Sequence, residues 1–144
     1  MNHSNAHDHY NSLTAEQIIK DVNTCNDKLE ALTGARPTLI RCPFGEYDDH
    51  VITAVRGMGI EPIQWDVDSL DWKNLSAAEI AARVTSGVKN GSIVLFHNNG
   101  LHTAEALPAV IADLKEKGFT FVRIDDLIYK DGYYIDADGR QIKQ

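Results

Sequence analysis

Residues 90–97 read NGSIVLFH, and this stretch decides the fold class. Its first two residues, Asn90 and Gly91, form a common turn signal. The run from Ser92 to His97 is almost continuously apolar, which is typical of a β-strand buried on both faces. Such strands belong to parallel sheets that helices cover, so we expect an α/β protein.

Helices are predicted on both sides of this strand. Ser76 and Glu79, three residues apart, form a capping box that opens a helix reaching Val88. Apolar residues at helical spacing predict a second helix that starts at or near Thr103 and stops before Gly118. The strand is therefore expected at the centre of a helix–strand–helix unit.

Helices and strands alternate along the rest of the chain as well. The expected elements are, in chain order, a helix over 14–32, a strand over 38–40, a helix over 48–57, a strand over 63–67 and a last strand over 119–123. This alternation predicts a parallel sheet, either doubly wound or part of a barrel. The chain's 144 residues are too few for a complete eight-fold barrel, which needs about 250.

Composition narrows the class of protein. A chain of 144 residues with 43% hydrophobic and 24% charged residues fits a single globular domain. The net charge of -7 argues against a nucleic-acid partner, since a phosphate backbone selects clustered lysines and arginines. No apolar run approaches the roughly 20 residues of a membrane span, and no secretory signal is visible. Cys25 and Cys42 lack the spacing of a zinc knuckle and are expected to be free thiols.

Polar and chain-breaking residues follow the predicted strands, where parallel α/β proteins carry their chemistry. In chain order they are Arg41 to Gly45, then Asp66, Asp68, Asp71 and Trp72, then His97, then Asp125 and Asp126. In a parallel sheet these loops share one rim, so we expect a functional site there. Chance placement of acidic residues would explain part of the same pattern.

His3 and His7 are candidate metal ligands. On a helical turn their side chains share a face and can bind one divalent cation through nitrogen, as zinc prefers. A frayed terminus or the remnant of a tag would give the same pattern. A catalytic zinc site needs a further ligand, a carboxylate or a third histidine from another segment. The other N-terminal histidine, His9, is treated with His50 and His102 as an ordinary surface residue or as one that supports a neighbouring site residue.

His97 is a candidate general acid. It ends the central strand near Asp71, and a carboxylate partner fixes both the tautomer and the charge of an imidazole. The alternative is a hydrogen-bonded core histidine without a catalytic role.

Four motifs, taken together and in this order, resemble those of the polysaccharide deacetylases, the NodB-homology carbohydrate esterases. They are His3-Ser4-x-x-His7, Arg41-x-Pro43-x-Gly45, Asp68-Ser69-Leu70-Asp71-Trp72 and Ile93-Val94-Leu95-Phe96-His97. The resemblance covers positions 2 to 128. It implies a NodB-like, distorted and here partial (β/α) barrel over 1–128, and we expect a C-terminal hairpin or arm over 129–144. It also implies a divalent metal, usually zinc, in a groove that accepts polymers of N-acetylated glucosamine such as peptidoglycan or chitin.

The resemblance also implies a role for each matching residue. His3 and His7 would be metal ligands, and Arg41 would position the carboxylate that serves as catalytic base. The main-chain N–H of Phe44 would help to bind the oxyanion. Trp72 and Leu95 would line the pocket for the acetyl group, and His97, tuned by Asp71, would protonate the departing amine.

This chain departs from the family pattern at four points. Cys42 stands where a second proline is common, Phe44 where tyrosine is common, and Asn98 where aspartate is frequent. The family's first motif, a strand ending in Thr-Phe-Asp-Asp, would lie before His3 and supplies the base and the third metal ligand. We therefore expect the domain to lack its first strand, and the chain alone to be inactive.

Two functional hypotheses follow. The first is a metal-dependent polysaccharide N-deacetylase, acting on the cell envelope or outside the cell as most of the family does. The second is a non-catalytic remnant that binds glycan or serves in assembly. In either case the uncovered strand edge predicts self-association, or complementation by the missing N-terminal segment.

Overall fold

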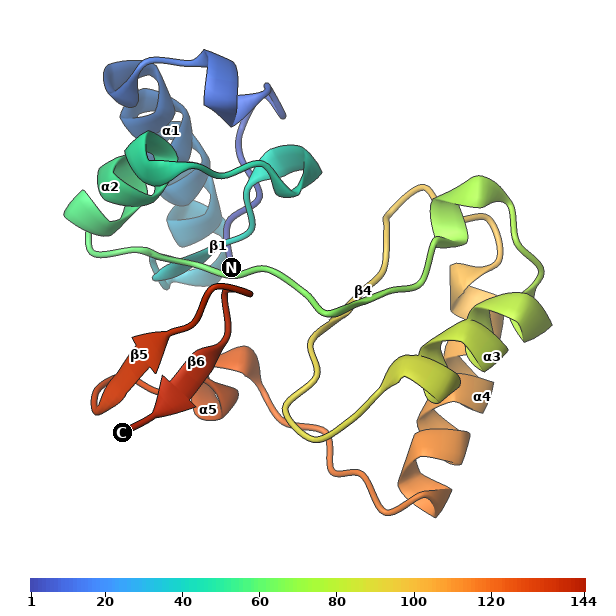
Figure 1. Cartoon of the computed structure of the whole chain (residues 1–144). Coiled ribbons are helices and arrows are strands. Elements are labelled where there is room, and N and C mark those ends of the chain that lie inside the picture. Colours follow the sequence, from blue (N-terminus) through green and yellow to red (C-terminus); the bar gives the residue numbers. More distant parts are fainter. The chain divides into compact units, whose positions relative to one another are not determined.

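The computed structural model describes residues 1–144 as helices that alternate with very short strands (Figure 1). Close contacts divide the chain into two units, Met1–Gln64 and Trp65–Gln144. We call them unit 1 and unit 2 and describe each by itself. No helix in the structure has the length and apolar character needed to cross a membrane.

Unit 1 is built from two helices and one pair of parallel strands. In chain order its elements are η1 (Tyr10–Ser12), α1 (Ala15–Thr33), β1 (Leu39–Ile40), η2 (Pro43–Gly45), α2 (Asp49–Gly57) and β2 (Glu61–Pro62). β1 pairs in parallel with β2, with Leu39 opposite Glu61. Asn2 forms a single parallel bridge to Ile40 on β1.

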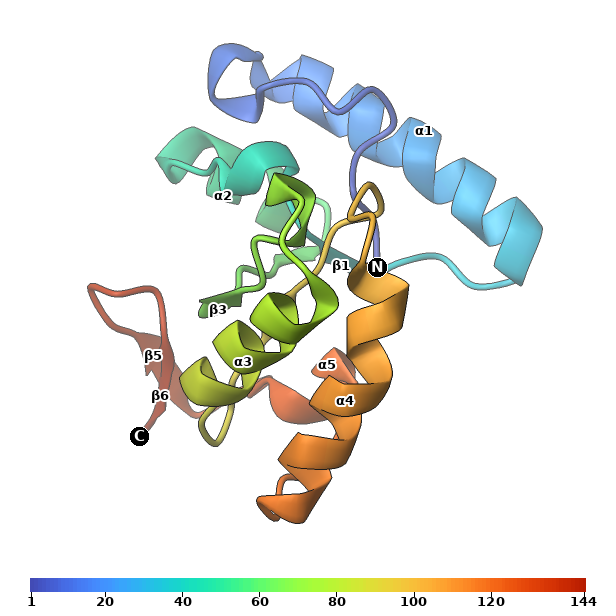
Figure 2. The ribbon, with the colours of Figure 1, turned by 90° about the vertical axis from the view of Figure 1, so that its right-hand side faces the viewer.

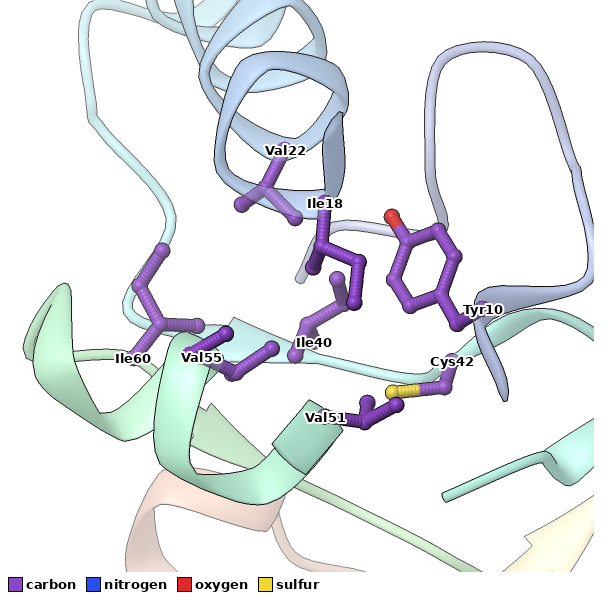
Figure 3. Packing of buried hydrophobic residues seen from close by; sticks show 9 residues of the cluster. Tyr10, Ile18, Val22, Ile40, Cys42, Val51, Val55 and Ile60 are labelled. Atoms are coloured by element: carbon purple, nitrogen blue, oxygen red, sulfur yellow. The ribbon is translucent and has the colours of Figure 1, made fainter. Parts of the chain in front are cut away.

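The core of unit 1 lies where the two helices meet the strand (Figure 3). Ile18 and Val22 of α1 and Val51 and Val55 of α2 are fully buried against Ile40 of β1. The two positions on each helix are four residues apart, which places them on one face. Burial of those apolar faces fixes β1, whose carboxyl end leads directly into the residues 41–45 discussed below.

Unit 2 combines a second parallel pair with two longer helices and a hairpin. Its elements are β3 (Val67–Asp68), η3 (Asp71–Lys73), α3 (Ala77–Gly87), β4 (Val94–Leu95), α4 (Thr103–Glu116), α5 (Ile124–Leu127), β5 (Tyr133–Ile135) and β6 (Gln141–Lys143). β3 pairs in parallel with β4, and β5 pairs antiparallel with β6. Helices α3 and α4 lie side by side in both views (Figures 1 and 2), and Val84 packs with Val110 and Leu114.

The predicted helices are confirmed, and so are their caps. Thr14 with Gln17 and Ser76 with Glu79 both form reciprocal capping boxes. Gly34, just beyond α1, adopts the left-handed conformation (φ 74°) that ends helices. The mixed α/β class is therefore confirmed.

The predicted strand over 63–67 is wrong in its bounds. The chain instead forms two strands, β2 just before that range and β3 beginning at its last residue, because its N–H groups meet two different partners. Ile63 donates to the carbonyl of Ile40 at 2.7 Å, whereas Val67 donates to the carbonyl of Ile93 at 3.3 Å. The apolar pattern of the segment indicated a strand but carried no information about this change of partner.

The other two predicted strands differ as well. The central strand is reduced to Val94 and Leu95, and only Leu95 is buried, because β4 has a strand neighbour, β3, on one edge alone. The stretch 119–123 is no strand at all. No strand pairs with it, and both Phe121 and Val122 are exposed. Asp125 and Asp126 consequently lie in α5 and not at the end of a strand.

Candidate active-site groups

The first group lies in unit 1 on the loop that carries His3 and His7. The prediction that these histidines share a helical turn is wrong, because Ser4 (φ 70°) and His7 (φ 59°) adopt left-handed backbone conformations. This tight loop nevertheless brings the two imidazole rings together, with centroids 5.0 Å apart. His3 Nδ1 lies 2.8 Å from the carbonyl oxygen of Arg41, which can only accept, so Nδ1 carries the proton. Its Nε2 then keeps a lone pair for a metal.

The donor atoms of this loop fit part of a zinc site. Two neutral imidazoles are nitrogen ligands of the kind zinc prefers, and the backbone contact of His3 fixes the tautomer a ligand needs. Residues 1–144 hold no cluster of three histidine, cysteine, aspartate or glutamate side chains that could bind a metal. The histidine pair therefore fits two positions of a site that usually has three protein ligands.

Phe44 lies next to the histidines and has an unusual backbone. It sits in η2 with φ at 56°, a left-handed conformation that is rare for a residue with a side chain. Its ring stacks on His9, with centroids 4.0 Å apart, and meets the ring of His7 at 4.6 Å. In this turn Gly45 and Glu46 donate backbone hydrogen bonds, whereas the Phe44 N–H takes no part in them. The Phe44 N–H therefore has no hydrogen-bond partner within the turn.

Arg41 follows β1 in the same unit. Its guanidinium lies partly buried, with Nη2 3.5 Å from the carbonyl oxygen of Gln64. Burial lowers the pKa of Arg41 from its usual value, although a guanidinium stays charged at any physiological pH. The structure therefore holds a positive charge at the end of β1, on the same residue whose carbonyl orients His3.

The second group lies in unit 2 and centres on Asp71 and His97. Asp71 Oδ1 lies 2.8 Å from His97 Nδ1, and Oδ2 accepts a hydrogen bond from the His97 backbone N–H at 3.0 Å. The Asp71 side chain is fully buried, while His97 keeps about a third of its side chain exposed (30%). Because the carboxylate can only accept, His97 Nδ1 carries a proton and Nε2 is the nitrogen that faces other partners.

Thr103 and Gly100 hold Asp71 in place. The Thr103 hydroxyl, at the first residue of α4, donates to Asp71 Oδ2 at 2.5 Å. A Cβ at position 100 would lie 2.0 Å from that hydroxyl oxygen and 2.7 Å from Asp71 Oδ2, so only glycine fits. Burial alone would raise the pKa of Asp71, but the hydrogen bonds from Thr103 and His97 lower it below its usual range. The carboxylate is therefore ionised beside His97.

Trp72 and Leu95 accompany this pair. The Trp72 ring is 6.3 Å from the imidazole of His97, centroid to centroid, and nearly half of the residue is exposed (47%). Leu95 lies buried on β4, two residues before His97. The structure thus gathers His3, His7, Arg41 and Phe44 in unit 1, and Asp71, Trp72, Leu95 and His97 in unit 2.

Sequence reasoning missed three residues that organise these groups. Asp21 holds the histidine loop from α1, His9 stacks on Phe44, and Thr103 was read only as the start of a helix. His9 was recognisable as a neighbour of His7. Asp21 gave no signal, because its partners lie 11 to 17 residues away in the sequence.

Comparison with known proteins identifies the family to which the chain is similar. The family model for polysaccharide deacetylase matches residues 1–63. The chain is 34% identical over 125 residues to a bifunctional xylanase/xylan deacetylase of Cellvibrio japonicus, covering 86% of this chain and 19% of that protein. It is 33% identical over 132 residues to the peptidoglycan-N-acetylglucosamine deacetylase PgdA of Listeria monocytogenes, covering 88% and 27%.

A solved structure extends the likeness beyond residue 63. A family 4 carbohydrate esterase pseudoenzyme from Bacillus anthracis matches with a TM-score of 0.83 at 31% identity, over 88% of this chain and 44% of that one. The chain belongs to the polysaccharide deacetylase family, as its four motifs indicated. It spans about a fifth to a half of the length of the curated relatives it matches.

Proposed function

We propose that this chain forms part of a metal-dependent hydrolase that removes N-acetyl groups from polysaccharides containing N-acetylglucosamine. The observation that carries the proposal is the hydrogen bond between the buried carboxylate of Asp71 and Nδ1 of the partly exposed His97. Buried carboxylates beside exposed imidazoles are typical of proton-transfer sites, because the fixed negative charge stabilises the imidazolium form.

His97 acts as the general acid in this proposal. Hydrolysis of an amide breaks the bond between the carbonyl carbon and nitrogen, and the amine is a poor leaving group unless it gains a proton. His97 Nε2 donates that proton to the nitrogen as the bond breaks. Asp71, held by Thr103, stays ionised and keeps Nδ1–H directed toward itself. Acetate and a free amino sugar are the products.

His3 and His7 are the proposed metal ligands. A divalent metal, which we propose to be zinc, supplies Lewis-acid activation of the acetyl carbonyl and of water when it is bound. The protein's part is to present two imidazole nitrogens, and the bond from His3 Nδ1 to the Arg41 carbonyl leaves Nε2 as the coordinating atom.

The remaining residues have supporting roles in this proposal. The Arg41 guanidinium orients the carboxylate that acts as base, and the N–H of Phe44 donates to the oxyanion that develops on the acetyl oxygen. Trp72 and Leu95 form the wall that receives the acetyl methyl group. Their exposed indole and buried aliphatic side chain suit a small apolar substituent on a polar sugar.

The proposed substrate is peptidoglycan or a chitin-like polymer. Support comes from the activity named for PgdA, which is deacetylation of N-acetylglucosamine in peptidoglycan. Because that polymer lies in the cell envelope, we propose that the protein acts there or outside the cell. We further propose that both units belong to a NodB-like (β/α) barrel, for which the parallel pairs β1–β2 and β3–β4 are the support.

A second copy of the chain is a proposed partner. Phe121 and Val122 lie exposed next to each other in a stretch that pairs with no strand, and neighbouring exposed apolar side chains favour association. Light scattering over a range of protein concentrations should show association that Phe121→Lys weakens. A monomer at every concentration would contradict this part of the proposal.

A non-catalytic role is the second candidate. It is favoured by the structural likeness to the Bacillus anthracis protein, which is described as a pseudoenzyme. In that case the chain would bind N-acetylated glycan without hydrolysing it, or serve in assembly.

Acetate release separates the two candidates. The full-length protein, loaded with zinc, is incubated with a chitin oligomer or with purified peptidoglycan, before and after treatment with a chelator. We expect acetate from the zinc-loaded sample, little after chelation, and recovery when zinc is restored. Glycan binding without acetate release under all three conditions would favour the non-catalytic role.

A further inference from the structure

Asp21 ties the histidine loop to helix α1. Its Oδ2 accepts from the Ser4 hydroxyl at 2.7 Å, from the Tyr10 hydroxyl at 2.7 Å and from the Asn5 N–H at 3.0 Å. Its Oδ1 accepts from the Ala6 N–H at 2.9 Å. Three of the four donors belong to the residues that lie between His3 and His7. A single carboxylate therefore holds the whole connection between the two imidazoles.

The bonds continue from Asp21 toward His7. The Ser4 hydroxyl, which donates to Asp21, accepts the backbone N–H of His7 at 2.9 Å. The backbone N–H of Ser4 donates to Asn2 Oδ1 at 2.6 Å. Asn2 Nδ2 in turn donates to Asn26 Oδ1 of α1 at 2.7 Å. The loop is thus fixed to α1 by Asp21, by Asn26 and by Lys28, whose Nζ donates to Asn5 Oδ1 at 2.6 Å. Of these three, Asp21 is the one linked through the Ser4 hydroxyl to the backbone N–H of His7.

The loop needs this support because its backbone is unfavourable. Ser4 and His7 both have positive φ, which costs free energy in any residue that has a Cβ. Loops of this kind persist only where surrounding contacts stabilise them. Here four of the compensating hydrogen bonds go to Asp21, and none of their donors is a proposed metal ligand.

The electrostatic state of Asp21 suits this task. Burial would raise the pKa of its carboxyl group, but the hydrogen bonds from Ser4, Tyr10 and the two backbone N–H groups lower it. Burial raises the pKa of Tyr10, and the bond to Asp21 raises it further, so that the phenol keeps its proton and donates. Both partners therefore stay in the protonation states that the geometry requires.

We propose that Asp21 is a positioning residue that shapes the His3–His7 pair as a metal site before any metal binds. This inference rests on the proposed function, in which those histidines are ligands. Asp21 lies on α1, whose Ile18 and Val22 are buried in the core of unit 1, so the loop is attached to a helix that the core holds in place. A preformed pair binds metal more tightly than a mobile one, because less conformational freedom is lost on binding.

The test is Asp21→Asn, which keeps the shape of the side chain but removes its charge and leaves an NH2 group facing a donor. Zinc is added to the protein while the ring signals of His3 and His7 are followed by NMR, a method that measures the weak binding expected of a two-ligand site. We expect zinc affinity to fall by about 10- to 100-fold, as found when groups that orient metal ligands are changed. In the metal-free protein, the amide hydrogens of Asn5 and Ala6 should exchange with solvent faster than in the unaltered chain.

Three further variants make the result specific. Asp27→Asn makes the same change of charge on α1, but Asp27 pairs with Arg36 and should leave zinc affinity unchanged. Val55→Ala weakens the core of unit 1 without touching the loop, and should also leave the affinity unchanged well below its unfolding temperature. Tyr10→Phe removes one of the four donors to Asp21 and should lower the zinc affinity less than Asp21→Asn does. If Asp21→Asn fails to fold, Tyr10→Phe takes its place in the test.

The outcomes distinguish this inference from the proposed function. Suppose that the unaltered protein binds zinc and that Asp21→Asn binds it equally tightly. That result would overturn the role of Asp21 but not the proposed function. If Asp21→Asn does not fold, equally tight binding by Tyr10→Phe would have the same meaning. An equal loss in Val55→Ala would overturn the role of Asp21 too, because the effect would then be one of general stability. No interaction of zinc with His3 or His7 in the unaltered protein would overturn the proposed function and this inference with it.

Discussion

The two candidate groups are organised in opposite ways. In unit 1 the proposed metal ligands, His3 and His7, are exposed. The carboxylate of Asp21, which we propose positions them, bonds to the residues between them and to neither imidazole. In unit 2 the ordering carboxylate, Asp71, is bonded directly to the imidazole that we propose as the acid. One group orders its histidines through the backbone, and the other orders its histidine through a buried charge.

This difference matches the two kinds of chemistry. A metal ligand has to present a neutral nitrogen with a free lone pair, and an adjacent carboxylate is not needed for that. A general acid has to hold a proton, which a neighbouring negative charge favours. The comparison therefore predicts that changes in unit 1 act on metal content, whereas changes in unit 2 act on proton transfer and on the stability of the buried charge.

The largest effect is expected from His3→Ala and His7→Ala. Each variant leaves a single imidazole in the loop, so zinc binding should become undetectable, and acetate release by the full-length protein should fall to that of the chelated enzyme. Zinc content is measured by elemental analysis after dialysis. Retention of stoichiometric zinc in the double variant would show that the ligands lie elsewhere.

Thr103→Val is expected to have an intermediate effect. It replaces the hydroxyl that donates to Asp71 by a methyl group of the same shape, and a hydrogen bond to a charged group contributes about 1.5–3 kcal/mol. The free energy of unfolding in urea should fall by about that amount, with zinc binding to the histidine loop unchanged. Thr103→Ser is the matched control and should behave like the unaltered chain. A loss in Thr103→Ser with none in Thr103→Val would mean that the methyl group, and not the hydroxyl, is what matters.

Much of this organisation was predictable from the sequence, but only where neighbouring residues determine it. Capping boxes at Thr14 and Ser76 predicted helices because their partners lie three residues away. The pairing of Asp71 with His97 followed from motifs at two strand ends. Asp21 could not be found, since no local pattern distinguishes it from the other acidic residues of α1. The absence of a strand at 119–123 depends on pairing partners that a local pattern does not describe.

The smallest effect is expected from Asp71→Asn, on how the free energy of unfolding depends on pH in acid. The pKa of Asp71 is lower in the folded state than the value of about 3.9 in an unfolded chain. Its carboxylate therefore contributes stability that is fully present above that value and is lost as pH falls through the lower, folded-state pKa. Asp71→Asn should remove this contribution, so that unfolding free energy depends less on pH below about 4. If the unfolding free energy of Asp71→Asn changes with pH in that range as steeply as that of the unaltered chain, other carboxylates cause the loss of stability in acid.

The central claim is that metal binding and proton donation belong to different groups, and His97→Ala tests it most directly. Zinc content and acetate release from a chitin oligomer are measured on the same preparation of the full-length protein. We predict unchanged zinc and a fall in acetate release by a factor on the order of 10² or more, since general acid catalysis is worth about 10² to 10⁴. Wild-type activity, or loss of zinc together with activity, would contradict the account.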